Sequence, residues 1–445
     1  MSRRFRGLLF GLILVWWALA ARAGSGRLTY QQYSELSGEK RAALMRAYVK
    51  RAEGYYQVSL SSYLVRTDIS AERALAHAVE MDEFHRCFSS IFVGPFKIRA
   101  RPELYVMKTK TSYANAYNKW ACGMGAMPGW SAGLFATLGP NKHALFGCAE
   151  YGAEELHETL FHEGTHQLLQ YYVGDEIIPR WFDEGCATNF QTWTVARSPQ
   201  RNIHEEIWKS EYPEVLCEMK TGKVRSVTLQ DGTTLTVGAG GVKPDLLELM
   251  NTTPTIWLGS ANPTPLYAQG WGFVNFLLAQ GDVGQKYFNY LIMGCRQGRG
   301  EELKRLMPER DRQGLAAEWN KYLDNTIVPH VEFSRPVAAL LAKGRKAEAA
   351  AILAEGLKKH RSNPELLYFK GLAALEAGKA KEAYKILKPL EKKRPRHPEL
   401  YRVLGRAALE AGDRFKARKY LEEAMKEDYA DEEAKKLHRR SRGLR

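Results

Sequence analysis

The segment His162-Glu163-Gly164-Thr165-His166 places two histidines four residues apart, with a glutamate directly after the first. Positions four apart on an α-helix lie about 40° apart around its axis, so both imidazoles project from one face and can bind one metal ion. The preceding residues 153–161 favour a helix because they carry acids near their start and contain neither proline nor glycine. The spacing therefore predicts a helix that presents a pair of metal ligands.

Glu163 lies one position further round this helix than His162. There it reaches the ion less easily than the histidines do, but it can accept a proton from a water molecule bound to the ion. This combination predicts a Zn²⁺ site with a glutamate base. The alternative is a solvated helical face that carries two histidines and no metal, and a third ligand would favour the metal site.

A third ligand is available in the segment Pro179-Arg180-Trp181-Phe182-Asp183-Glu184-Gly185-Cys186-Ala187. An aromatic pair stands before two acids, and small residues follow. A second helix that begins near Trp181 and packs antiparallel on the first would bring Glu184 beside His162 and His166.

Together the two segments resemble the gluzincin (MA-type) zinc metallopeptidases, in which a second helix carries a glutamate ligand, often as W-x-x-E-G-x-A. The resemblance implies that His162, His166 and Glu184 bind Zn²⁺ and that Glu163 is the general base of a peptidase. More narrowly, the chain is similar over roughly residues 55 to 325 to a family of secreted bacterial proteins of unknown function in this class. Asp183 departs from the asparagine common at this place in aminopeptidase relatives.

In gluzincins a tyrosine or histidine downstream of the glutamate ligand often stabilises the oxyanion, and an edge strand upstream aligns the substrate. By this resemblance Tyr267 is the candidate for the first role, with packing in an aromatic helix as the alternative. Residues 130–136, which alternate small and apolar side chains after the turn-like Met127-Pro128-Gly129, are the candidate edge strand.

Two other residues of metal-binding type lie close to these motifs. Cys186 follows Glu184 by two positions, about 200° round the helix, so the two cannot easily share one ion. We assign Cys186 to packing or to a disulfide. His157 points well off the face of His162, and we expect it at the surface.

The first residues predict export. Arg3, Arg4 and Arg6 precede an apolar run from Leu8 to Ala20, which is short for a membrane span and is followed by Ala21-Arg22-Ala23. We expect a signal peptide, residues 1–23, cleaved near Ala23, with an uncleaved anchor as the alternative. No transmembrane span is expected in the mature chain.

Export also bears on the cysteines. In an oxidising compartment we expect one or more disulfides, and the sequence does not choose among the pairings. The chain has no C-x-x-C pair, which argues against a thiol redox site. The cysteines are Cys87, Cys122, Cys148, Cys186, Cys217 and Cys295.

The net charge of +15 is concentrated in the C-terminal region, because residues 334–445 hold 29 Lys and Arg against 16 Asp and Glu. The rest of the chain is close to neutral, which argues against specific nucleic-acid binding by the region that holds the motifs. This basic C-terminal region either attracts an anionic partner or only keeps a helical surface soluble.

The sequence of the C-terminal region repeats with a period of 34 residues. Pro364-Glu365-Leu366 recurs as Pro398-Glu399-Leu400, and a more degenerate copy is predicted to start near His330. This is the spacing of tetratricopeptide repeats, and about three of them bury a continuous core. By this resemblance the array offers a concave surface to a partner protein, whereas the alternative is a structural buttress docked on the preceding domain.

These patterns predict an α+β gluzincin-like metallopeptidase domain over residues 24–329, an all-α tetratricopeptide solenoid over 330–433 and a basic tail over 434–445. The elements expected are helices at 29–51, 71–92, 265–280 and 315–325, strands at 56–65 and 104–107, and a hairpin at 224–237 around Asp231-Gly232.

The function expected from the sequence is an exported zinc peptidase that acts on peptides or proteins. The alternative is a scaffold that contains zinc, has no catalytic activity and works through its tetratricopeptide repeats. A retained Glu163 favours the enzyme, because a structural zinc site has no chemical need for a base beside the ion.

Overall fold

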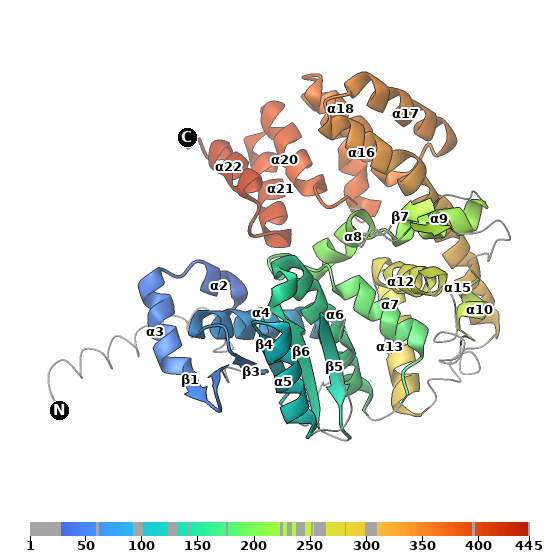
Figure 1. Cartoon of the computed structure of the whole chain (residues 1–445). Coiled ribbons are helices and arrows are strands. Elements are labelled where there is room, and N and C mark those ends of the chain that lie inside the picture. The colour runs from blue at the N-terminus through green and yellow to red at the C-terminus, as the bar shows by residue number, and fades with distance from the viewer. Residues whose placement is uncertain are drawn as a thin grey trace. The chain divides into compact units, whose positions relative to one another are not determined.

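The computed structural model of the chain (Figure 1) describes residues 28–58, 62–91, 101–122, 132–139, 142–174, 177–222, 226–228, 234–236, 245–250, 252, 264–280, 282–298, 309–393 and 397–443. The expected signal peptide and the Asp231-Gly232 turn lie outside these residues. The chain divides into two compact units, residues 1–172 and 173–445. The boundaries expected from the sequence, 24–329 and 330–433, stay a prediction.

The first unit contains a six-stranded mixed sheet in the order β1-β2-β3-β4-β6-β5. Strands β3, β4 and β6 run parallel, while β1, β2 and β5 pair antiparallel with their neighbours. Strand β5 lies at an edge of this sheet, as expected for residues 130–136, of which residues 130 and 131, like the turn expected at 127–129, lie outside the described residues. The strands are β1 (Val49–Ala52), β2 (Tyr55–Val58), β3 (Leu64–Thr67), β4 (Glu103–Met107), β5 (Gly133–Thr137) and β6 (His143–Cys148).

Helices cover both faces of this sheet. Successive side chains of a strand point to opposite faces, and Phe146 of β6 packs with the aromatic residues of α5 (Lys110–Ala121). On the other face Gly147 lies against Leu156 and Leu160 of α6 (Ala153–Val173). Helix α4 (Ala71–Ser89) packs on α6, where the rings of Phe84 and Phe161 stack at 4.2 Å.

Two expectations for the start of the chain are wrong. The helix expected at 29–51 is two helices, α2 (Tyr30–Ser34) and α3 (Gly38–Tyr48), because Ser37 caps a new helix start by accepting a hydrogen bond from the amide of Lys40. The last residues of the expected helix, 49–51, belong instead to strand β1. The strand expected at 56–65 is the pair β2 and β3, which lie antiparallel.

The second unit is mostly helical. The strands of the expected hairpin are present as β7 (Ser226–Thr228) and β8 (Thr234–Thr236). The helices before the repeats are α7 (Arg180–Phe190), α8 (Pro199–Lys209), α9 (Tyr212–Thr221), α10 (Leu246–Leu249), α12 (Thr264–Ala279), α13 (Asp282–Arg296) and α15 (Glu309–Tyr322).

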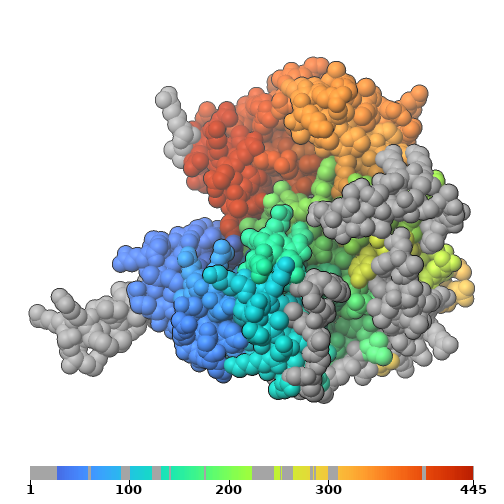
Figure 2. Space-filling view, viewed as in Figure 1, coloured from blue at the N-terminus to red at the C-terminus, as the bar shows by residue number. Residues whose placement is uncertain are grey.

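Helical hairpins form the end of this unit, after the π-helical turns η3 (Leu323–Ile327) and η4 (His330–Ser334). Figure 2 shows the atoms of these hairpins as one continuous body, coloured orange to red. Leu366, Leu387 and Leu404 are fully buried between them. The helices are α16 (Arg335–Ala342), α17 (Lys346–Lys359), α18 (Pro364–Glu376), α19 (Ala380–Leu387), α20 (Leu400–Glu410), α21 (Arg414–Glu427) and the final α22 (Glu432–Ser441).

The disulfides expected from export are absent from the described residues, where all six cysteines are thiols. Five of them are buried and pack as small apolar side chains. Burial raises the pKa of the Cys87 thiol to about 11 and that of Cys295 to about 12. In the described part of the chain, no helix is both long and apolar enough to cross a membrane.

Candidate metal centre

Glycines let helix α6 lie directly on the sheet. A Cβ atom on Gly133 of β5 would stand 2.0 Å from Thr159 Cγ2 of α6, and one on Gly147 would stand 2.8 Å from Leu156 Cδ1. Real side chains do not approach so closely, so glycine at these two positions sets the distance between helix and strands. This contact places the helix that carries His162 and His166 beside the edge strand.

Glu163 is oriented by that edge strand. The backbone N–H of Phe135 in β5 donates a hydrogen bond to Glu163 Oε2 at 2.8 Å. The bond fixes one carboxylate oxygen, and the side chain stays only half-buried. Glu163 is therefore a partly accessible carboxylate whose position is fixed by the strand, and it stands between His162 and His166 in the sequence.

A second pair of glycines positions Glu184. Helix α7 crosses α12 at Gly185 and Gly270, where a Cβ on Gly185 would lie 2.5 Å from the carbonyl oxygen of Gly270. A Cβ on Gly270 would lie 2.7 Å from the carbonyl oxygen of Trp181. The glycine after the glutamate is therefore a packing requirement, and the crossing brings Tyr267 of α12 near the start of α7.

Arg180 links Glu184 to Tyr267. Its Nη2 lies 2.5 Å from Glu184 Oε1, and its guanidinium is hydrogen-bonded to the Tyr267 side chain. Burial acts to lower the pKa of Arg180, but Glu184, Asp183 and Tyr267 together raise it. Glu184 is only 3% exposed, so this ion pair compensates a buried carboxylate. Sequence reasoning missed Arg180, although its place four residues before Glu184 on a helix could have revealed it.

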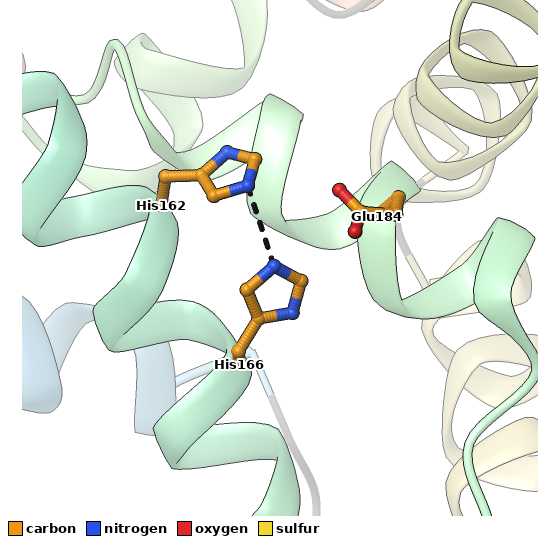
Figure 3. A group of neighbouring side chains, drawn as sticks. All are labelled: His162, His166 and Glu184. Carbon is orange, nitrogen blue, oxygen red and sulfur yellow. Dashed lines mark hydrogen bonds between the residues drawn. The ribbon is translucent and has the colours of Figure 1, made fainter. Parts of the chain in front are cut away.

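The structure brings His162, His166 and Glu184 together (Figure 3). One ring nitrogen from each histidine and one oxygen of Glu184 all lie within 4.8 Å of one another. The Nε2 atoms of the two imidazoles are 3.3 Å apart. All three residues were expected here from the two sequence motifs.

The group fits a zinc ion in its donor chemistry. Two imidazoles and one carboxylate form a donor set that catalytic zinc sites use. Two nitrogens bound to one tetrahedral zinc at about 2.05 Å each would be about 3.3 Å apart, which matches the separation of the histidine nitrogens. Arg180 engages one oxygen of Glu184, and a carboxylate has a second one to offer.

The neighbouring residues of metal-binding type are engaged elsewhere. His157, expected at the surface, is partly buried, and its Nδ1 lies 3.0 Å from Glu80 Oε1 of α4. Burial acts to raise the pKa of Glu80, but hydrogen bonds from His157 and His77 lower it to about 2. Cys186 is fully buried, in agreement with packing. Asp183 Oδ2 lies 3.9 Å from Arg180 Nη1. Asp183 does not cap α7, because no side chain accepts a hydrogen bond at the start of this helix.

The comparison with protein families gives a match in the C-terminal part of the chain. The tetratricopeptide repeat family matches residues 374–440, from the end of α18 to α22. This match confirms the repeats expected in this region, and such repeats are modules of protein interaction. Among curated proteins none matches the chain.

Proposed function

We propose that the chain is an exported zinc metallopeptidase of the gluzincin type, with His162, His166 and Glu184 as metal ligands and Glu163 as general base. The observation that carries the proposal is the approach of the three donor groups to within 4.8 Å. The hydrogen bond from Phe135 to Glu163 adds a positioned base to the helix that supplies two of them. Export rests on the sequence of residues 1–23.

In this proposal the side chains divide the work of hydrolysis. Zinc would supply Lewis-acid chemistry, which acidifies water and polarises a carbonyl group. Glu163 would accept the proton of the attacking water on its carboxylate, while the Phe135 amide holds that carboxylate in place. Tyr267, fixed by its hydrogen bond to Arg180, is the proposed donor to the developing oxyanion.

The edge strand supports a peptide as the substrate. Among the described residues, β5 pairs with another strand only on its β6 side, so the opposite edge, which includes the Phe135 amide that binds Glu163, can offer further backbone groups to an extended chain. Hydrogen bonds of this kind are specific for a peptide backbone and do not depend on its side chains. They favour a peptidase over a hydrolase that acts on another class of compound.

The substitution Glu163→Gln tests the proposal. We expect turnover of a peptide library by the purified zinc-loaded chain to fall by at least about 100-fold, because the base is lost. The zinc content should stay the same, because Glu163 is not a proposed ligand. Glu154→Gln, on an exposed first-turn position of α6, is the matched control and should cleave like the wild type. Equal cleavage by the Glu163→Gln variant would refute the role of Glu163.

A second candidate function is a scaffold that contains zinc but does not catalyse a reaction. The match of residues 374–440 to the tetratricopeptide repeat favours it, because such repeats bind proteins. This candidate predicts zinc at full occupancy with no cleavage of any peptide in the library. The same experiment therefore separates the two candidates.

A further inference from the structure

Helix α8 is buried on nearly all sides although it is rich in polar and charged residues. All residues from 201 to 207 are buried, including Arg201, Glu205 and Glu206. A helix buried all round lies between two bodies and not at a surface. Within the second unit one neighbour of α8 is the pair α7 and α12. The other is the inner face of the repeats, which we define as α16, α18 and the residues that lead into α20.

Trp208, near the end of α8, packs against this inner face. Its ring lies 6.1 Å from that of Phe369 in α18 and 5.3 Å from that of His397, which precedes α20. It also lies 4.5 Å from the ring of His330 in η4. One side chain of α8 thus contacts segments that belong to successive hairpins of the array.

Arg335 of α16 caps the end of α8. Its Nη2 donates to the carbonyl oxygens of Ile207 at 3.1 Å and Trp208 at 3.2 Å, and also to that of Ser210. The last carbonyls of a helix carry partial negative charge and lack partners within the helix, so a guanidinium is a suitable cap. Arg335 Nε in turn donates to His330 Nε2 at 3.1 Å, which fixes the guanidinium within the array.

The start of α8 contacts the last hairpin. The backbone N–H of Ser198, the N-cap of α8, donates to the carbonyl oxygen of Glu427 at 2.8 Å. Next to it, Arg197 Nε lies 3.0 Å from Asp428 Oδ2. Helix α8 therefore runs across the array from its last hairpin to its first. A cavity of about 370 Å³ between them has walls from both, including Arg201 of α8.

The opposite side of α8 holds α7 and α12. Glu206, which is 1% exposed, accepts a hydrogen bond from Trp271 Nε1 at 2.9 Å and another from Thr192. Trp271 follows Gly270, where α12 crosses α7, and Thr192 lies two positions after Phe190, the last residue of α7. Through these bonds α8 is fixed to the two helices that carry Glu184 and Tyr267.

We infer that the ligand of the inner face of the repeats is helix α8 of the same chain. The array then acts as an internal clamp that fixes α7 and α12 through α8, and its inner face is not a free docking surface for a partner. The inference does not depend on zinc or on catalysis. Where the proposed function also holds, the clamp keeps Glu184 and Tyr267 in place.

Hydrogen exchange in the full-length chain tests the clamp. Trp208→Ala removes the aromatic contacts, and we expect the amides of α8 and of α16 to exchange at least about tenfold faster, with α5 of the first unit as an unchanged internal reference. Trp208→Phe is the conservative control. Phenylalanine keeps an aromatic ring and lacks the indole N–H. Because Trp208 Nε1 has no hydrogen-bond partner in the described residues, exchange in the Trp208→Phe variant should stay near the wild-type rate. Phe415→Ala, at a residue 76% exposed on α21, should change nothing in α8.

Arg335→Ala provides a second test in case Trp208→Ala does not fold. It removes the cap at the end of α8 and should accelerate exchange in the same helix. Unchanged exchange of α8 in both folded variants would overturn the inference. Because the measurement needs no metal and no substrate, a failure of the clamp is distinguishable from a failure of the proposed peptidase.

Discussion

At the residue scale, Gly185 decides where Glu184 lies. The sequence pattern W-x-x-E-G-x-A predicted a glutamate ligand without giving a reason for the glycine. The structure supplies the reason, since the nearest atoms to an added Cβ are backbone atoms of Gly270 that no side-chain rotation can move. The partner glycine lies 85 positions downstream, and no periodicity connects the two. The residues could be predicted from sequence, but their crossing could not.

Gly185→Ala should destabilise the chain by about 2–3 kcal/mol, because the added methyl forces α7 and α12 apart. Thermal or urea unfolding measures this loss. Gly314→Ala in α15 is the matched control, since nothing lies within 4 Å of its added Cβ. It should stabilise the chain by about 0.5–1 kcal/mol, through helix propensity alone. Equal effects of the two substitutions would show that the crossing is not tight.

At the element scale, helices with a clear apolar period were predicted well, and breaks set by a single cap were not. The helix at 71–92 is α4, and the helix with the two histidines is α6. The break before α3 depends on Ser37 accepting one hydrogen bond, a local choice that the long run of helix-forming residues concealed. The edge position of β5 could be proposed only from the resemblance, because strand order depends on contacts between distant segments.

The junction of α21 with α8 should make stability depend on pH. Burial raises the pKa of Glu427 to about 7, with Glu423 and Glu205 acting in the same direction and Arg201 against it. Between the ordinary pKa of 4.5 and about 7 the folded chain holds a proton that the unfolded chain releases. The free energy of unfolding should therefore fall as pH rises through about 7, by up to about 3 kcal/mol.

Urea unfolding of the wild type and of Glu427→Gln at pH 5.5 and pH 8 measures this contribution. The glutamine cannot ionise, so the variant should lose less stability than the wild type over this range. The difference between the two proteins isolates Glu427 from other groups that titrate. If both lose the same free energy, Glu427 does not titrate near pH 7.

At the scale of the whole molecule, the period of 34 residues was enough to predict the tetratricopeptide repeats. The same period could not show what lies on their inner face, because Trp208 and Phe369 are 161 positions apart and belong to no common pattern. The expectation of disulfides was wrong for a related reason. Cysteine content and compartment predict that disulfides form, but pairing depends on which segments meet in suitable geometry, and the five buried cysteines pack as unbonded apolar side chains.

The central claim is that His162, His166 and Glu184 hold one zinc ion. Elemental analysis of the purified chain, after exposure to zinc and removal of the excess, tests it most directly. We predict about one zinc per wild-type chain, full retention in Glu163→Gln, and loss of most zinc in His166→Ala in a chain that remains folded. A folded wild-type chain without bound zinc, or zinc retained at full level by His166→Ala, would contradict the claim.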